Sequence, residues 1–207
     1  MNEISIHNIG HMVGSHIAKK ADIPNKAKVL SYGAEILIGG IVKSAILFSV
    51  SILLDIVIEA AFLLLVVAIM RTLSGGVHCT AYYRCLITSI IVFVGLGYTI
   101  KTMYPVLSVL SPVVLGGVIA LSAYLYWRYA PQAPPNKPFK TQAAETAFRR
   151  YTLAAVFALS LIVFLLGVES LISWIIAAAL LWQGFTLTPM GYGFIKFIDV
   201  LLTPSRS

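Results

Sequence analysis

Charged residues are scarce in this chain: Asp, Glu, Lys and Arg make up 11% of its 207 residues, whereas 59% are hydrophobic. The mean hydropathy is +0.91. Because soluble domains carry about 25% charged residues, this composition excludes a soluble globular domain and predicts an integral membrane protein. Alternation of polar and apolar residues is also missing from the long apolar runs, which excludes a transmembrane barrel. We therefore predict an all-α transmembrane helical bundle.

The apolar runs set the predicted domain organisation. A helix needs roughly 20 residues to cross a bilayer, and six stretches approach or reach that length. We expect one membrane-embedded domain over residues 1–207, with a cytoplasmic or interfacial arm (1–32), six transmembrane segments (33–189) and a cytoplasmic tail (190–207). The predicted spans are Glu35 to Leu54, Ile56 to Met70, Leu86 to Ile100, Val106 to Tyr126, Tyr151 to Val168 and Ser170 to Pro189.

The first 32 residues lack an apolar core long enough for a signal peptide, so we expect this arm to be retained. Its apolar residues recur at spacings of three and four, which predicts a short amphipathic helix on an anionic leaflet. These residues are Ile6, Ile9, Val13 and Ile17. Three histidines also lie in the arm, but no carboxylate or cysteine completes a ligand set, so no metal site is predicted.

Basic residues collect on one side of the predicted bundle. The arm, the joint from Arg71 to Cys85, the loop from Arg128 to Arg150 and the tail contain thirteen of the fifteen Lys and Arg. The opposite joints carry Asp55, Lys101 and Glu169 instead. Since basic loops stay in the cytoplasm, both termini are predicted to be cytoplasmic.

The chain has only two cysteines, and both lie within the stretch RTLSGGVHCTAYYRC, residues 71–85. This stretch is therefore the candidate site for cysteine chemistry. His78 and Cys85 are seven residues apart, which separates them by about 10.5 Å along a regular helix. A Cys–His pair therefore requires a bent segment, for which Gly75 and Gly76 supply backbone freedom. Such a pair makes sense because an imidazole or a cation favours the nucleophilic thiolate.

A plainer interpretation stays open at this point: Cys85 could open the next span as a small buried residue, with His78 at the headgroup level. Arg71 and Arg84 could add positive potential to the site. A zinc site is not predicted, because three ligands without a standard spacing are too few. A disulfide is not expected on a reducing cytoplasmic face.

The stretch with Gly75, Gly76, His78 and Cys85 resembles the accessory gene regulator protein B (AgrB) family of Gram-positive bacteria. That family has Gly-Gly-x-His followed by Cys seven positions after the His. The Pro-rich, Lys-containing loop APQAPPNKPFK, residues 130–140, is similar to the loop that relatives carry before the fifth span. The resemblance implies a multi-pass protein of the bacterial cell membrane.

In that family the His and the Cys are the catalytic pair of an endopeptidase. The enzyme removes the C-terminal tail of a propeptide and helps to form a thiolactone-cyclised signalling peptide for quorum sensing. By position, the resemblance implies Cys85 as nucleophile and His78 as base, while Cys79 is structural. Neither a cofactor nor a metal is implied.

The expected partners are a propeptide of the AgrD type and membrane lipid, with no nucleic acid; a homodimer is an open alternative to a monomer. The basic residues that could hold an acidic propeptide tail are Lys137, Lys140, Arg149 and Arg150. Further candidates for substrate binding are Arg71, Gly75, Gly76 and Arg84. Glu145, Asn136 and Gln183 are open candidates for a third catalytic residue.

Two other functions compete with the endopeptidase. One is a small transporter or exporter subunit that uses Lys43 within the first span. The other is a non-catalytic factor for peptide export. The polar residues gather at one interface rather than at the midplane, which argues against a transporter.

Overall fold

The computed structural model describes residues 6–77, 79–109, 112–133, 139 and 141–203. Within these ranges the chain is helical, and strands are absent apart from one isolated bridge between Gly75 and Gln132. The helices are α1 (Ile6–Lys20), the short 3-10 helix η1 (Pro24–Lys26), α2 (Ala27–Leu53), α3 (Val57–Ser74), α4 (Tyr82–Leu107), α5 (Pro112–Tyr129), α6 (Gln142–Leu166), α7 (Leu171–Phe185) and α8 (Pro189–Leu201).

Among the described residues, four helices are long and apolar enough to cross a membrane: η1 with α2, then α3, α4 and α6. The pair α7 and α8 raises the number to five if it forms one broken span, since the two helices are bent by 84°. The all-helical membrane fold is thus confirmed. The fourth predicted span, Val106 to Tyr126, corresponds to α5, which has 18 residues and ends in the polar-aromatic sequence YLYWRY. Six spans therefore remain a prediction.

The chain forms two compact units, residues 1–49 and 50–207. In the first unit, α1 packs against α2 through small residues. A β-carbon on Gly10 would lie 2.8 Å from Cβ of Glu35, and one on Gly14 would lie 2.2 Å from the backbone nitrogen of Ser31. Ala18 continues this buried stripe. The glycines thus allow close packing of two helices. The amphipathic arm lying on a leaflet stays a prediction, although the helix itself is present.

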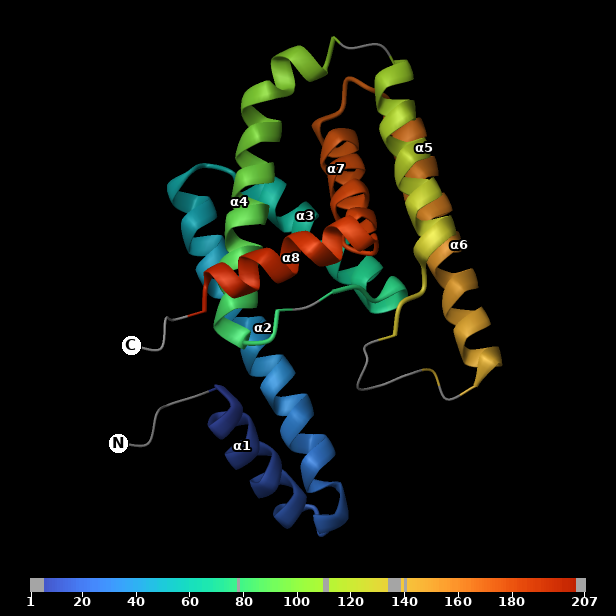
Figure 1. Cartoon of the computed structure of the whole chain (residues 1–207). Coiled ribbons are helices and arrows are strands. Elements are labelled where there is room, and N and C mark those ends of the chain that lie inside the picture. The colour runs from blue at the N-terminus through green and yellow to red at the C-terminus, as the bar shows by residue number, and fades with distance from the viewer. Residues whose placement is uncertain (1–5, 78, 110–111, 134–138, 140, 204–207) are drawn as a thin grey trace. The chain divides into compact units, whose positions relative to one another are not determined.

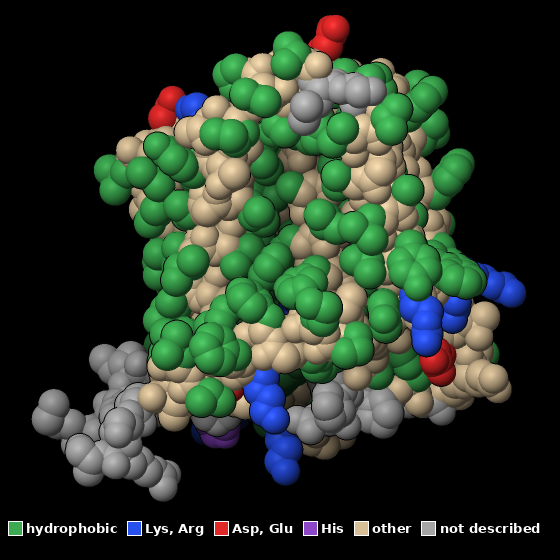
Figure 2. Space-filling view, turned by 45° about the horizontal axis from the view of Figure 1, so that its top comes forward, with side chains coloured by type: hydrophobic (Ala, Val, Ile, Leu, Met, Phe, Trp, Pro, Cys, Tyr) green, Lys and Arg blue, Asp and Glu red, His purple; other side chains and the backbone are tan. Residues whose placement is uncertain are grey.

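In the second unit, α7 is the central helix and packs against α3, α4, α5 and α6 (Figure 1). Trp174, Ile175 and Leu180 on α7 are almost fully buried. The outer faces of the surrounding helices carry exposed hydrophobic side chains, and Figure 2 shows such side chains over most of one face, with charged ones toward its two ends. An outer surface this apolar is typical of a protein whose surface faces lipid.

One end of this unit carries the residues that the topology prediction placed opposite the motif. Lys101 forms an ion pair with Asp55, with 2.7 Å between Nζ and Oδ2. The hydroxyl of Tyr104 donates to the carbonyl oxygen of Glu169. The joints between alternate helices therefore meet at one end, as their residues predicted.

Candidate active site

The motif stretch is a break between two helices. α3 ends at Ser74 and α4 begins at Tyr82, so both helices extend beyond the predicted spans toward the motif. Gly75 has a φ of +74° and caps α3 by donating its N–H to the carbonyl oxygen of Arg71, at 3.0 Å. A positive φ is easy for glycine and costly for other residues, so Gly75 ends α3. The bend that a Cys–His pair requires is present.

Gly75 also touches the loop that follows α5. A β-carbon at Gly75 would lie 1.8 Å from the carbonyl oxygen of Gln132. The N–H of Gln132 donates to the carbonyl oxygen of Ser74 at 2.8 Å, and its side-chain amide donates to the carbonyl oxygen of Leu187 at 2.5 Å. Gln132 thus joins the end of α3 to the corner between α7 and α8.

Gly76 faces α7. Its φ is +127°, and a β-carbon there would lie 3.1 Å from Oγ1 of Thr186 and 3.4 Å from Nε2 of Gln183. Gln183 is fully buried and donates from Nε2 to the carbonyl oxygen of Gly75 at 2.8 Å and to Oγ of Ser74 at 3.3 Å. The central helix therefore holds the glycine turn in place. That the two glycines bind substrate stays a prediction.

Cys85 lies in the first turn of α4. Its N–H donates to the carbonyl oxygen of Ala81 at 3.2 Å, and Ala81, the N-cap residue, offers no side-chain cap. The side chain of Cys85 is half-buried, and its thiol is free. Helix N-termini are one of the settings in which reactive cysteines are found.

Arg71 brings a positive charge to the same place. It lies in the last turn of α3, half-buried, and interacts electrostatically with Cys85, Cys79 and Tyr192. Its guanidinium also donates a hydrogen bond to the carbonyl oxygen of Val77, the residue before His78. Arg71 thus combines the cationic environment that a thiolate needs with a contact to the loop that carries the predicted base.

Cys79 sits in a different environment. Its Sγ lies 3.9 Å from Oγ1 of the buried Thr88. Burial raises the pKa of the Cys79 thiol above its ordinary value, which keeps the thiol protonated near neutral pH. A protonated thiol is a poor nucleophile, which agrees with the structural role expected for Cys79.

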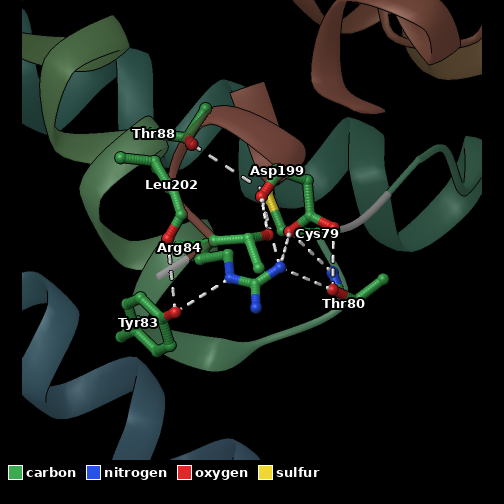
Figure 3. A network of polar contacts seen from close by, with 8 residues as sticks. Cys79, Thr80, Tyr83, Arg84, Thr88, Asp199 and Leu202 are labelled. Atoms are coloured by element: carbon green, nitrogen blue, oxygen red, sulfur yellow. Dashed lines mark hydrogen bonds and ion pairs between the residues drawn. The ribbon is translucent and has the colours of Figure 1, made fainter. Parts of the chain in front are cut away.

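Asp199, on α8, ties down the start of α4 (Figure 3). Oδ1 accepts from the backbone N–H of Thr80 at 3.1 Å, and Oδ2 accepts from the Thr80 hydroxyl at 2.7 Å. Arg84 completes the network, with Nη1 3.3 Å from Oδ1 of Asp199 and Nε 3.0 Å from the hydroxyl of Tyr83. The guanidinium of Arg84 is therefore engaged within the chain, and its predicted contact with substrate stays untested.

The remaining predicted residues lie apart from this break or outside the description. Arg149, on α6, donates to the carbonyl oxygen of Trp127 at 3.0 Å and is exposed, as are Arg150 and Glu145. Four candidates lie outside the described residues: His78, Asn136, Lys137 and Lys140.

A pocket of about 390 Å³ opens beside the break. Its lining includes Tyr129, Gln132, Leu187 and Tyr192. Tyr192 connects this pocket with Arg71, with which it interacts electrostatically. The buried Oε1 of Gln132 has no hydrogen-bond partner among the described residues, so the pocket region offers an acceptor to a peptide N–H.

Sequence reasoning missed Asp199, Thr80 and the helix α8. The tail nevertheless carries a signal for this helix: Gly191, Ile195 and Asp199 follow one another at intervals of four residues and form the buried face of α8. A carboxylate on an inward helix face that is otherwise apolar indicates a specific partner. Residues 190–207 were expected only as a cytoplasmic tail, and the structure instead shows a helix over most of them.

Comparisons with known proteins agree with this architecture. The family model of Accessory gene regulator B matches residues 11–187. A protein of Clostridium perfringens (strain SM101 / Type A) described as AgrB-like is 24% identical over 206 residues, with 94% of this chain and 96% of the relative covered. A second, described as AgrB-like protein 2, from Clostridium perfringens (strain 13 / Type A), is 25% identical over 208 residues with the same coverage. No solved structure shows significant similarity. This chain belongs to the AgrB family.

Proposed function

We propose that this chain is a membrane cysteine endopeptidase that cleaves the C-terminal tail from a propeptide of the AgrD type. Membership of the AgrB family implies a role in agr quorum sensing. The observation that carries the finer proposal is the position of Cys85, in the first turn of α4 and within electrostatic range of Arg71. A helix N-terminus and a neighbouring cation are both typical surroundings of reactive cysteines.

The reaction begins with attack of the Cys85 thiolate on the carbonyl carbon of the scissile peptide bond. His78 donates a proton to the leaving amine, and the tail departs with a new amino terminus. The propeptide remains attached to Cys85 through a thioester. A propeptide cysteine then attacks this thioester, gives up its proton to His78, and closes a thiolactone while Cys85 leaves as a thiolate.

Ring closure competes with hydrolysis of the thioester. Exchange of one thioester for another conserves the bond type, whereas attack by water discharges the intermediate irreversibly. A site at the membrane interface, screened by apolar helices, limits access of water. The propeptide thiol reacts within the same molecule, so its effective concentration is high.

Substrate recognition divides into two regions in this proposal. The pocket next to Gln132 and Tyr192 receives the segment around the scissile bond, close to Arg71 and the glycine turn. Basic residues hold the acidic tail: Lys137, Lys140 and the exposed Arg149 and Arg150. Both termini and this site face the cytoplasm of the bacterial cell, where the propeptide is made.

The experiment that tests the proposal uses the purified chain in lipid vesicles and a synthetic propeptide with an amphipathic start, a central cysteine and an acidic end. A short reading frame beside the gene that encodes such a peptide would favour this proposal over a transporter or an export factor, and would give the peptide's sequence. Mass spectrometry follows release of the tail and a thioester on the enzyme. We expect both to disappear in Cys85→Ala and His78→Ala and to persist in Cys79→Ser. Release of the tail by Cys85→Ala would end the proposal.

A further inference from the structure

The last helix, α8, has two unlike faces. Gly191, Ile195 and Asp199 are buried against the protein. The exposed side is largely apolar, with Met190, Phe194, Phe197 and Leu201, and it also carries Lys196. Asp199 is thus the carboxylate that α8 turns inward, toward the start of α4.

The contacts of Asp199 surround the beginning of α4. Thr80 precedes the N-cap residue Ala81, and Arg84 precedes Cys85. Asp199 accepts two hydrogen bonds from Thr80, at 3.1 and 2.7 Å, and pairs with Arg84 at 3.3 Å. Arg84 also reaches the Thr80 hydroxyl at 3.1 Å, so the three side chains form one closed network. The network brackets the first turn on which Cys85 stands.

This arrangement supplies what the local sequence lacks. Helix α4 has Ala81 at its N-cap, which cannot accept a hydrogen bond from the first turn through a side chain. A carboxylate near the helix N-terminus also interacts favourably with the free N–H groups there. Asp199 therefore acts as an anchor for α4 that is delivered from another helix.

We infer that Asp199 is a positioning residue: by holding Thr80 and Arg84, it fixes the first turn of α4 and thereby the direction in which Cys85 presents its sulfur. The inference rests on the proposed function, in which Cys85 attacks the propeptide. The residues matched by the family model end at 187, so α8 and Asp199 lie beyond them. The anchor is a property of this chain rather than of the matched region.

A purely electrostatic role of Asp199 and a positioning role would affect the reaction in opposite directions. Arg71, Cys79 and Tyr82 all interact electrostatically with Cys85, and Asp199 interacts with Cys79. An anion near a thiol disfavours the thiolate, so an Asp199 that acted only through its charge would slow the reaction. Removal of the carboxylate would then speed acylation, whereas loss of positioning would slow it. The two roles give opposite signs.

The test measures acylation and binding separately. In a Cys79→Ser background, rapid mixing and mass spectrometry give the rate at which the propeptide forms a thioester on Cys85, and fluorescence anisotropy gives its Kd. For Asp199→Ala we expect acylation to slow about 10- to 100-fold, since misplacement of a reacting group by about 1 Å has that effect. We expect the Kd to change less than about threefold, because Asp199 is buried behind the first turn.

Two further variants keep the result interpretable if Asp199→Ala folds poorly. Asp199→Asn retains one acceptor for Thr80 and should slow acylation less. Arg84→Met keeps both bonds from Thr80. Since Asp199 and Arg84 act in one network, the double variant should be no slower than the slower single variant, which is a non-additive result.

Hydrogen exchange distinguishes positioning from a general loss of stability. In Asp199→Asn, amides from Cys79 to Cys85 should exchange faster, while those in α3 and α7 keep their rates. The matched control is Asp55→Asn, which removes another aspartate from an ion pair, at the opposite end of α3. Acylation by Asp199→Asn at or above the wild-type rate, or faster exchange throughout the chain, would overturn the inference. Absence of a thioester in the wild type would refute the proposed function instead, and the exchange rates would still decide the anchor.

Discussion

Gly75 and Gln132 approach each other so closely that a β-carbon on the glycine would lie 1.8 Å from the Gln132 carbonyl oxygen. The contact joins residues from two loops and includes a hydrogen bond from Gln132 to Ser74. The glycine pair of the motif therefore has a structural reason that is independent of any contact with substrate.

Gly75→Ala should destabilise the protein by about 2–4 kcal/mol, because it combines a positive φ with a clash against backbone. We expect a lower Tm in lipid or detergent and loss of propeptide processing. The matched control is Gly95→Ala in α4, where a new β-carbon meets nothing within 4 Å. Alanine favours a helix over glycine, so that variant should be as stable as the wild type or slightly more so. Equal stability of the two variants would contradict the close approach.

The Cys79 thiol should react readily only at high pH. Because burial raises the pKa of the Cys79 thiol, its thiolate is scarce until the pH exceeds the ordinary value of about 8.5. In Cys85→Ala, alkylation of Cys79 by iodoacetamide should therefore be slow at pH 7 and accelerate only above about pH 9. Quantitative mass spectrometry at a series of pH values measures this rate. Alkylation of Cys79 that is already complete at pH 7 would show that its thiol is not shielded.

The ion pair between Asp55 and Lys101 should make the stability of the protein depend on pH in the acid range. Hydrogen bonding and attraction to Lys101 lower the pKa of Asp55 below its ordinary value, so the folded state favours the carboxylate. Its contribution is present above the unfolded pKa of about 3.9 and is lost as the pH falls through the lower folded pKa. Asp55→Asn should remove this part of the dependence of Tm on pH.

Lys101→Met tests the same ion pair by removing the other charged side chain. It should lower the Tm near neutral pH and bring the acid dependence close to that of Asp55→Asn, since each variant breaks the same pair. Because the pair is exposed, salt should weaken it. A Tm that responds to acid identically in the wild type and both variants would refute the pairing.

Neutralising the proposed tail-binding residues should weaken capture of the propeptide without affecting the chemistry. The change is a fourfold variant in which Lys137, Lys140, Arg149 and Arg150 become Gln. The KM should rise about tenfold while kcat stays within about twofold, because the lost interaction is made with bound substrate before the chemical step. Alkylation of Cys85 should be unchanged.

A matched control for this variant is Lys196→Gln, an exposed cation on α8. Salt offers a second check, since an electrostatic contact weakens as ionic strength rises. A KM that does not change with either charge or salt would contradict tail binding by these residues.

The sequence predicted the features that follow from local composition. Continuous apolar runs predict membrane helices, and Gly75 and Gly76 predicted the bend between them. The ends of the helices were harder, because the polar residues Tyr82 to Cys85 and the first turns of α6 continue helices past their apolar segments. A search for apolar runs stops where hydropathy falls, although the backbone hydrogen bonds continue.

The contacts of the candidate site could not be predicted from local sequence. Gln183 was a candidate for a catalytic role, and the structure shows its amide holding Gly75 and Ser74. Thr80 and Asp199 meet across 119 positions of the chain. No periodicity within either segment indicates such a pairing, because it depends on how α8 folds back onto α4.

Because of this separation in sequence, Thr80 and Asp199 are synthesised at different times. At roughly 5–20 residues per second, the ribosome completes Asp199 about 6 to 24 s after Thr80, since 119 residues separate them. During synthesis, the turn that carries Cys85 therefore emerges and enters the membrane before its anchor exists. Under the proposed function, the nascent chain therefore holds the nucleophile before the network that positions it, because that network forms only when α8 has folded back onto α4.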